Sequence, residues 1–420
     1  MSQKLTKSYN VFKDQLYRNS GFMVLSRLLN VAAGFFFWVI AAKLYSIAEV
    51  GTATELISSL NLIMLLSRFG FDYSLIRYVA NTDKNNVFNT SLAITTIAAV
   101  AVSMLYILIK SPFQATPAQY GIMFILIAVF NSITLITGSL FCALRKGEYF
   151  FIQTILASLR IFLLFPLVNL KSFGIFLALG TCFVISSIYS LWVLSKEIKI
   201  DFFDVDRRFI RDSCRFSIGS FFSNILIEAP TLILPIMVLH LIGQEEAAKY
   251  YMAMNIGNLA LIVPYALSFS LFVEGSHDEP LKQNIIKACV AAYLFLIPIA
   301  IVISFWGRNI LALISEEYVE AYFLLLLVIA ASFFAVVHMI FLSVQNIKMK
   351  VGRNIKFNLF RFLLLIGTSY YFINKYNING VGYAWLLTHV ILTIVIATKF
   401  IKAGFIKILN RSQVKSTEEA

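Results

Sequence analysis

The sequence predicts an all-α integral membrane protein with about twelve transmembrane helices. Of its 420 residues, 59% are hydrophobic and only 14% are charged, and the mean hydropathy is +0.81. In a soluble domain about a quarter of the residues are charged. The apolar residues also occur in long blocks, and about 20 residues are what a helix needs to cross the hydrocarbon core of a bilayer. The composition therefore predicts a protein that is embedded in a membrane.

Twelve apolar blocks separated by polar breaks are the predicted spans. In chain order they cover 19–42, 51–70, 88–109, 120–143, 151–170, 174–195, 216–242, 248–273, 284–306, 321–344, 357–373 and 379–400. The eleventh is the shortest and contains Arg361. Without it the number of spans would be odd, and the termini would lie on opposite faces. The first block is too long for the apolar region of a signal peptide, so we expect it to be retained.

The distribution of lysine and arginine tests the number of spans. Basic residues concentrate in the loops on the cytoplasmic side of a membrane. With the N-terminus in the cytoplasm, 25 of the 35 basic residues fall in cytoplasmic segments and 6 fall in outer loops. Because this excess alternates from loop to loop, we expect both termini to be cytoplasmic.

The longest polar break lies in the middle of the chain and divides six spans from six. We expect an N-terminal six-helix bundle over 1–195, a cytoplasmic linker over 196–215, a C-terminal six-helix bundle over 216–400 and a cytoplasmic tail over 401–420. An offset of 197 residues aligns Glu49 with Glu246 and Asn61 with Asn258, which indicates a weak internal repeat. Two pseudo-symmetric bundles of this kind usually enclose a cavity that opens alternately to either side.

Charged residues inside the spans are the candidates for function, because a charge in a bilayer is costly and often marks a transport pathway. Arg27, Arg160 and Arg361 are candidates for binding an anionic head group in the cavity. A guanidinium stays charged and can bind phosphate through two parallel hydrogen bonds. The alternatives are structural: an ion pair between Arg27 and Glu228, or hydrogen bonds from Arg160 and Arg361 to neighbouring carbonyls.

Acidic residues and prolines in the spans are candidates for ion coupling and for helix bends. Glu228 is the first candidate for proton or ion coupling, since Pro230 and Pro235 follow it in the same span. Proline interrupts the hydrogen bonds of a helix, and broken helices occur at substrate sites of many transporters. Pro264 provides another bend. The alternative is a fixed kink with a protonated carboxylate, and for Glu55 we favour a position at the outer interface over coupling.

Several other classes of function find no support. The basic residues behind the net charge of +13 are scattered through short loops, which argues against nucleic-acid binding. The four cysteines form no CxxC pair and no cluster with histidine, so we expect no metal and no disulfide. His338 and His389 lie in spans, and we favour packing over proton relay for them. No Walker A, GxSxG or HExxH motif occurs, so we expect a transporter without cofactors rather than an enzyme. Its energy would come from an ion gradient, such as one of protons or sodium, from the membrane potential or from consumption of the product.

Several stretches resemble polysaccharide repeat-unit flippases of the Wzx type, members of the multidrug/oligosaccharidyl-lipid/polysaccharide (MOP) exporter superfamily. They are SRFGFDYSLIRYVA at 67–80, GRNIKFNLFRFLLL at 352–365, NINGVGYAWLLTHV at 377–390 and the segment from Phe216 to Glu274. The resemblance covers about residues 15–405. It implies two six-helix bundles, as in the MATE transporters of that superfamily, in a bacterial inner membrane. It also implies a substrate: an oligosaccharide unit of O-antigen or another surface polysaccharide on undecaprenyl pyrophosphate, moved to the periplasmic leaflet.

On this basis we expect alternating access, in which Arg27, Arg160 and Arg361 hold the pyrophosphate and the lipid tail stays in the bilayer. Protonation of Glu228 would reset the cycle. Expected partners are membrane lipids and the polymerase and chain-length machinery. The alternatives are an ion-coupled multidrug antiporter, which would use acidic residues where the first span has Arg27, and a lipid II flippase, which typically has additional C-terminal spans. A polysaccharide polymerase or ligase would need a large periplasmic loop.

Overall fold

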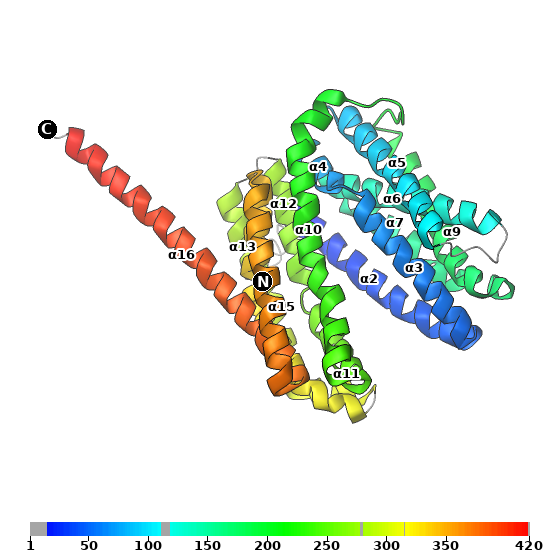
Figure 1. Cartoon of the computed structure of the whole chain (residues 1–420). Helices are drawn as coiled ribbons and strands as arrows, with labels where there is room; N and C mark the ends of the chain where they lie inside the picture. The colour runs from blue at the N-terminus through cyan, green and yellow to red at the C-terminus, as the bar shows by residue number, and fades with distance from the viewer. Residues whose placement is uncertain (1–14, 111–117, 278–279, 315, 419–420) are drawn as a thin grey trace, which may run out of the picture. The chain divides into compact units, whose positions relative to one another are not determined.

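The computed structural model describes residues 15–110, 118–277, 280–314 and 316–418, and these residues form helices without any strand (Figure 1). The first half contains α2 (Gln15–Leu44), α3 (Ile47–Ser67), α4 (Phe71–Tyr78), α5 (Lys84–Lys110), α6 (Ala118–Ala143), α7 (Gly147–Ser158), α8 (Arg160–Leu163), η1 (Val168–Leu170) and α9 (Lys171–Leu194). The second half contains α10 (Arg207–Ile242), α11 (Gln244–Leu259), α12 (Ile262–Ser276), α13 (Leu281–Ala312), η2 (Glu316–Ala321), α14 (Tyr322–Ile347), α15 (Val351–Tyr376) and α16 (Ile378–Glu418). The basic N-terminal stretch 1–14 lies outside the described residues.

The described helices include nine that are long and apolar enough to cross a membrane, and a bent pair, α11 with α12, that makes a tenth if it is one span. The pair bends by 49° where Ala260 and Leu261 interrupt the helix. A proline ring clashes with the carbonyl four residues earlier, and Pro264 places that clash at Ala260. Two further predicted spans correspond to α7–α8 and to α15. The predicted all-α, multi-pass membrane fold is confirmed.

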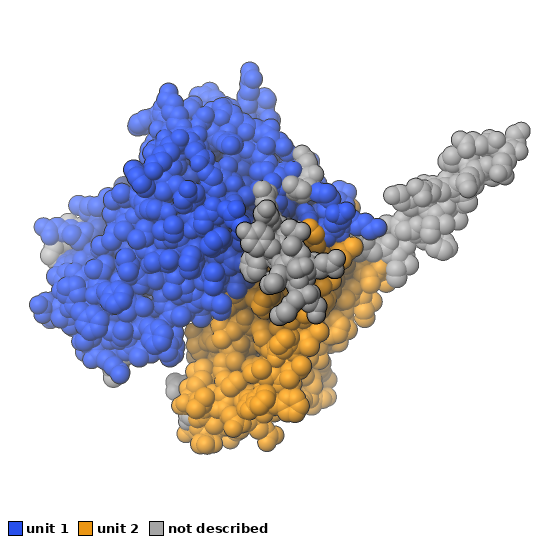
Figure 2. Space-filling view, turned by 180° about the vertical axis from the view of Figure 1, so that it is seen from behind, with its two compact units in different colours: residues 1–225, 269–284, 346–352 blue, residues 226–268, 285–345, 353–420 orange. Residues whose placement is uncertain are grey.

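The chain divides into two compact units (Figure 2). Unit 1 comprises Met1–Ile225, Phe269–Asn284 and Asn346–Gly352, and unit 2 comprises Leu226–Ser268, Ile285–Gln345 and Arg353–Ala420. Two short stretches from the second half of the chain thus belong to the unit that the first half builds. The first stretch contains the end of α12 and the start of α13, and the second contains the end of α14 and the start of α15.

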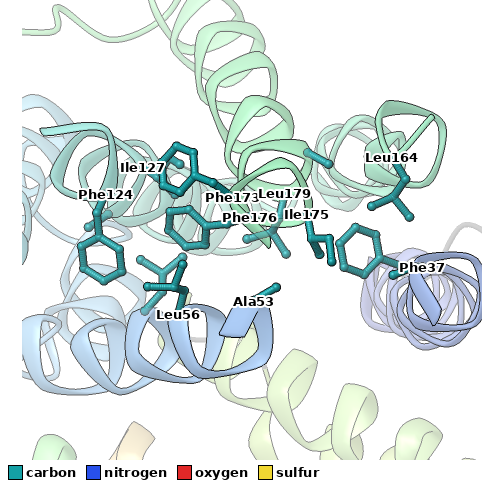
Figure 3. Packing of buried hydrophobic residues seen from close by; sticks show 14 of the residues in the cluster. Phe37, Ala53, Leu56, Phe124, Ile127, Leu164, Phe173, Ile175, Phe176 and Leu179 are labelled. Carbon is teal, nitrogen blue, oxygen red and sulfur yellow. The ribbon is translucent and has the colours of Figure 1, made fainter. Parts of the chain in front are cut away.

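The core of unit 1 is an aromatic and aliphatic cluster between α3, α6 and α9, with α2 and the turn after α8 at its edge (Figure 3). Phe124 and Phe176 stack with ring centroids 5.4 Å apart. Tyr45 is buried there and donates from its hydroxyl to the carbonyl oxygen of Leu164 (2.9 Å), in the turn after α8. Because lipid tails are as apolar as these side chains, close packing rather than transfer from water stabilises the cluster.

Unit 2 contains a smaller cluster formed by α14, α15 and α16. It consists of Phe341, Phe357, Leu392 and Ile396, all buried. The rings of Phe341 and Phe357 lie 4.9 Å apart. This contact holds α14 against α15, and the ring of Phe357 also lies 5.3 Å from that of His338 on α14.

The two glutamates that the internal repeat aligns occupy equivalent places, each in the first turn of a helix. Glu49 closes a capping box at the start of α3: its carboxylate accepts from the backbone N–H of Ser46 (2.9 Å). Glu246 lies in the first turn of α11 and binds Nζ of Lys249 (3.0 Å). An acidic side chain is favourable at the positive end of a helix. Helix initiation therefore explains this pair without a role in transport.

A tight turn at Gly70 joins α3 to α4 within the 67–80 motif. Gly70 has φ +76°, a conformation that costs other residues about 1–2 kcal/mol. A Cβ atom there would lie 2.0 Å from the carbonyl oxygen of Ser217 in α10. Both the backbone conformation and the close approach therefore require glycine.

We predict that Gly70→Ala destabilises the protein by about 3 kcal/mol, because left-handed strain adds to overpacking against backbone. The measurement is thermal unfolding of the purified protein in detergent. The matched control is Gly51→Ala in α3, where a Cβ atom would meet nothing within 4 Å. Equal melting temperatures for the two variants would contradict this account of the turn.

Candidate functional site

Arg160 is the first residue of α8, directly after the turn at Leu159 that ends α7. Its Nη2 donates to Oδ1 of Asn30 on α2 (3.3 Å). Its guanidinium carbon lies 5.6 Å from the ring centroid of Phe37. A Cβ atom on Gly34 would lie 3.7 Å from Nη2. Arg160 is half-buried, its Nε makes no hydrogen bond, and its contacts with α2 are with neutral groups.

The residues of α2 that contact Arg160 continue a face that includes Arg27. Arg27, Asn30, Gly34 and Phe37 follow one another at intervals of three and four, which places them on one side of the helix. The side chains of Arg27 and Asn30 are exposed. One face of α2 in unit 1 therefore carries Arg27 and contacts Arg160 of α8.

Arg361 lies on α15 in unit 2 and is 6% exposed. Its guanidinium carbon lies 5.8 Å from the ring centroid of Trp385 on α16. Its Nε and Nη1 make no hydrogen bond. Glu228 interacts with it electrostatically but accepts no hydrogen bond from those two nitrogens. Two buried nitrogens of Arg361 thus have no acceptor, and its role in binding an anion or in docking helices stays a prediction.

The remaining predicted residues are spread over three helices. Glu228 is exposed on α10, which continues through Pro230 and Pro235 as one helix. Glu55 is exposed on α3. Glu228 interacts electrostatically with Arg361 within unit 2, whereas the Arg27–Glu228 pair stays a prediction. No group of three or more His, Cys, Asp or Glu residues is placed to hold a metal ion in the described ranges.

Helix ends from both halves of the chain meet inside unit 1, on the side that the basic residues predict to be cytoplasmic. The hydroxyls of Ser74 on α4 and Ser217 on α10 are 2.6 Å apart and buried. The rings of Tyr73 and Phe272 stack 5.9 Å apart. We call these contacts, together with those that join Arg145 to Glu274, His277 to Ala143 and Tyr78 to Asp212, the α4–α10–α12 junction.

An ion pair and a hydrogen bond extend the junction to the end of α6. Arg145 pairs with Glu274 of α12, whose side chain is 3% exposed. Nε2 of His277 lies 2.8 Å from the carbonyl oxygen of Ala143. Arg145, one of the basic loop residues used to predict the topology, thus links two segments that are distant in the sequence. The positions of the loop residues in the sequence do not reveal this link.

A tyrosine extends the same junction to the start of α10. The hydroxyl of Tyr78 donates to the carbonyl oxygen of Asp212 (2.9 Å). Burial, with a contribution from the Asp212 carboxylate, raises the pKa of Tyr78 above its usual value. The phenol therefore stays a donor throughout the neutral pH range.

Comparison with protein families finds one that matches more than half of the chain. The model of the family described as polysaccharide biosynthesis protein matches residues 16–273. No curated protein matches the sequence. The match includes α2, the turn at Gly70, Arg160 and most of the junction.

Solved structures of transporters have the same fold at low sequence identity. A mutant of the Vibrio cholerae MATE transporter VcmN matches with a TM-score of 0.82 and 14% identity, covering 95% of this chain and 98% of that one. An outward-facing MATE multidrug resistance transporter of the MOP superfamily matches with 0.77 and 15%, covering 91% and 93%. A MOP superfamily transporter from Pyrococcus furiosus, described as having a binding pocket of reverse polarity, matches with 0.75 and 15%, covering 91% and 93%.

Proposed function

Because the chain belongs to the polysaccharide biosynthesis protein family and has the fold of MOP transporters, we propose that it is a lipid-linked oligosaccharide flippase. The substrate is a repeat unit of O-antigen or another surface polysaccharide on undecaprenyl pyrophosphate. It moves from the cytoplasmic to the periplasmic leaflet of a bacterial inner membrane. Unaided, the head group would lose its hydration in hydrocarbon, which is prohibitive for sugars and charged phosphates.

The observation that supports this substrate is that Arg160 and Arg361 have guanidinium nitrogens that make no hydrogen bond. Both are charged residues in predicted spans, and each has at least one guanidinium nitrogen without a hydrogen bond. An arginine in a bilayer is costly unless it is paired, and such residues usually mark a substrate path. A pyrophosphate supplies the anionic oxygens that these nitrogens lack. Arg27, on the same face of α2 as the partners of Arg160, adds a second cation within unit 1.

Transport in this proposal is alternating access. The α4–α10–α12 junction closes the cytoplasmic side and must open for the head group to enter. The lipid tail remains in the bilayer throughout. Glu228 is exposed on a helix with two prolines and interacts electrostatically with Arg361. When it exchanges a proton or another cation, it releases the head group from Arg361 or resets the cycle. Glu55 is the second candidate for such coupling.

A multidrug antiporter is the second candidate, since several of the matched structures are MATE transporters. Substrate charge discriminates the two. Cationic drugs require carboxylates, whereas the face of α2 presents Arg27 and Asn30 and receives Arg160. The arginines therefore favour an anionic substrate.

Polymerase and chain-length proteins are the proposed partners, because they use the product on the far side.

The proposed function is tested by deleting the gene in its host and complementing the strain with this chain. We expect lipid-linked oligosaccharide to accumulate on the cytoplasmic leaflet of the deletion strain, and surface polysaccharide to return on complementation. Normal surface polysaccharide together with increased sensitivity to cationic drugs in the deletion strain would instead establish the antiporter.

A further inference from the structure

Unit 2 encloses a group of polar side chains that the proposed transport cycle uses only in part. We call it the C-terminal polar cluster: His338 on α14, Asn358 and Arg361 on α15, and Trp385 and His389 on α16. Each of the five is at most 6% exposed. Asn358 and Arg361 are three residues apart and Trp385 and His389 four, so each pair shares a helix face. Five polar groups thus meet inside unit 2.

The hydrogen bonds of the cluster fix which nitrogen of each histidine carries a proton. Nε2 of His338 donates to Oδ1 of Asn358 (3.3 Å), and Nδ1 of His389 donates to the carbonyl oxygen of Trp385 (2.8 Å). A neutral imidazole has one donor and one acceptor nitrogen. Nδ1 of His338 and Nε2 of His389 are therefore lone-pair nitrogens. The two rings lie 6.2 Å apart.

The cluster also contains donors that have no acceptor. Nε and Nη1 of Arg361 and Nε1 of Trp385 make no hydrogen bond, although the guanidinium carbon lies only 5.8 Å from the indole. A buried donor without an acceptor costs about 1–3 kcal/mol, and more when it is charged. A fixed cation and an indole N–H without acceptors are what an oxyanion requires.

We propose that the C-terminal polar cluster is an oxyanion site that binds one phosphate group and takes up a proton as the anion enters. Arg361 and Trp385 donate to the phosphate oxygens, and Asn358 positions His338. The lone-pair nitrogen of His338 or His389 accepts a proton from solvent, since the arriving negative charge offsets the repulsion from Arg361. The charged and titratable groups around the two rings are Arg361 and the other histidine, and Glu228 acts through Arg361.

This inference deepens the proposed function, because it assigns one phosphate of the lipid head group to unit 2 and names the residues that couple its binding to protons. The same chemistry also admits free phosphate or pyrophosphate. A site for the lipid head group binds a short-chain prenyl diphosphate at least as tightly as inorganic pyrophosphate. A site for the free anion prefers the inorganic ligand.

The test is calorimetric titration of the full chain in lipid nanodiscs with inorganic pyrophosphate and with a short-chain prenyl diphosphate. Two buffers with different ionisation enthalpies report the protons taken up. We expect wild type to bind at least one ligand and to take up about one proton per anion. Arg361→Gln should weaken binding about 100-fold and Trp385→Phe about 10-fold, from the strength of charged hydrogen bonds. His338→Gln with His389→Gln should leave binding detectable and remove the proton uptake.

Matched controls are Arg308→Gln and Trp306→Phe on α13, where both side chains are exposed, and both should bind like wild type. The inference is overturned if wild type binds neither ligand, if Arg361→Gln and Trp385→Phe bind as wild type does, or if binding takes up no proton. Complementation of the deletion strain distinguishes the two proposals. Rescue by a wild-type protein that binds no anion refutes this site alone, and anion binding without rescue refutes the flippase alone.

Discussion

Oxidation of the double variant Ser74→Cys, Ser217→Cys should abolish transport, and reduction should restore it. The two hydroxyl oxygens are 2.6 Å apart within unit 1, so the side chains are close enough for the short Cβ separation that a disulfide needs. A bond between α4 and α10 would hold the α4–α10–α12 junction closed, and the head group could not enter from the cytoplasmic side. The measurement is flipping by the purified protein in vesicles before and after oxidation.

The experiment requires a background in which Cys142, Cys182, Cys214 and Cys289 are replaced, since all four are free thiols. The two single cysteine variants serve as controls and should be insensitive to oxidant. If the fully cross-linked protein flips its substrate as fast as the protein with reduced thiols, the junction does not open during transport.

Replacing Arg160 and Arg361 together by glutamine should reduce flipping about 1000-fold with little loss of folded protein. Nε of Arg160 and Nε and Nη1 of Arg361 make no hydrogen bond. Their replacement removes one hydrogen bond, from Nη2 of Arg160 to Asn30, so it should cost the fold little. A hydrogen bond to a charged group is worth about 1.5–3 kcal/mol, or roughly 10- to 100-fold per residue. The readout is the rate of surface-polysaccharide recovery in the complemented deletion strain, normalised to protein abundance.

Arg308→Gln is the matched control for this pair. Arg308 is exposed on α13, and its guanidinium carbon lies 5.1 Å from the ring of Tyr322. It should support recovery at the wild-type rate. Full recovery with the double variant would leave the arginines as structural groups and remove them from the proposed substrate site.

Much of the fold is predictable from the sequence because hydropathy and charge act over whole segments. A run of about 20 apolar residues has few alternatives in a bilayer, so the all-α, multi-pass fold is confirmed, and solved MOP transporters share it. The places where a span is broken depend on single residues. Pro264 identifies the bend between α11 and α12, whereas nothing in the polarity of α7–α8 predicts the turn at Leu159.

The candidate site is less predictable, because it depends on contacts between distant segments. Charge alone identifies Arg160 and Arg361, since a buried charge is rare in a span. Their neutral neighbours Asn30 and Trp385 carry no such signal. Their spacing in the sequence is a weaker signal, because it places them on a helix face with a candidate residue. Asn30 lies three residues after Arg27, and Trp385 lies four residues before His389. The pairing of Arg145 with Glu274 required the tertiary structure.

The most direct test of the central claim is reconstitution of the purified chain into vesicles with a fluorescent oligosaccharide on a polyprenyl diphosphate in both leaflets. Quenching or enzymatic modification from outside reports how much of the lipid becomes accessible. We predict that wild type makes the whole pool of labelled lipid accessible from outside within the assay, while empty vesicles expose half of it. If wild type exposes no more than empty vesicles when the imposed ion gradient and membrane potential are varied, the chain does not flip this substrate.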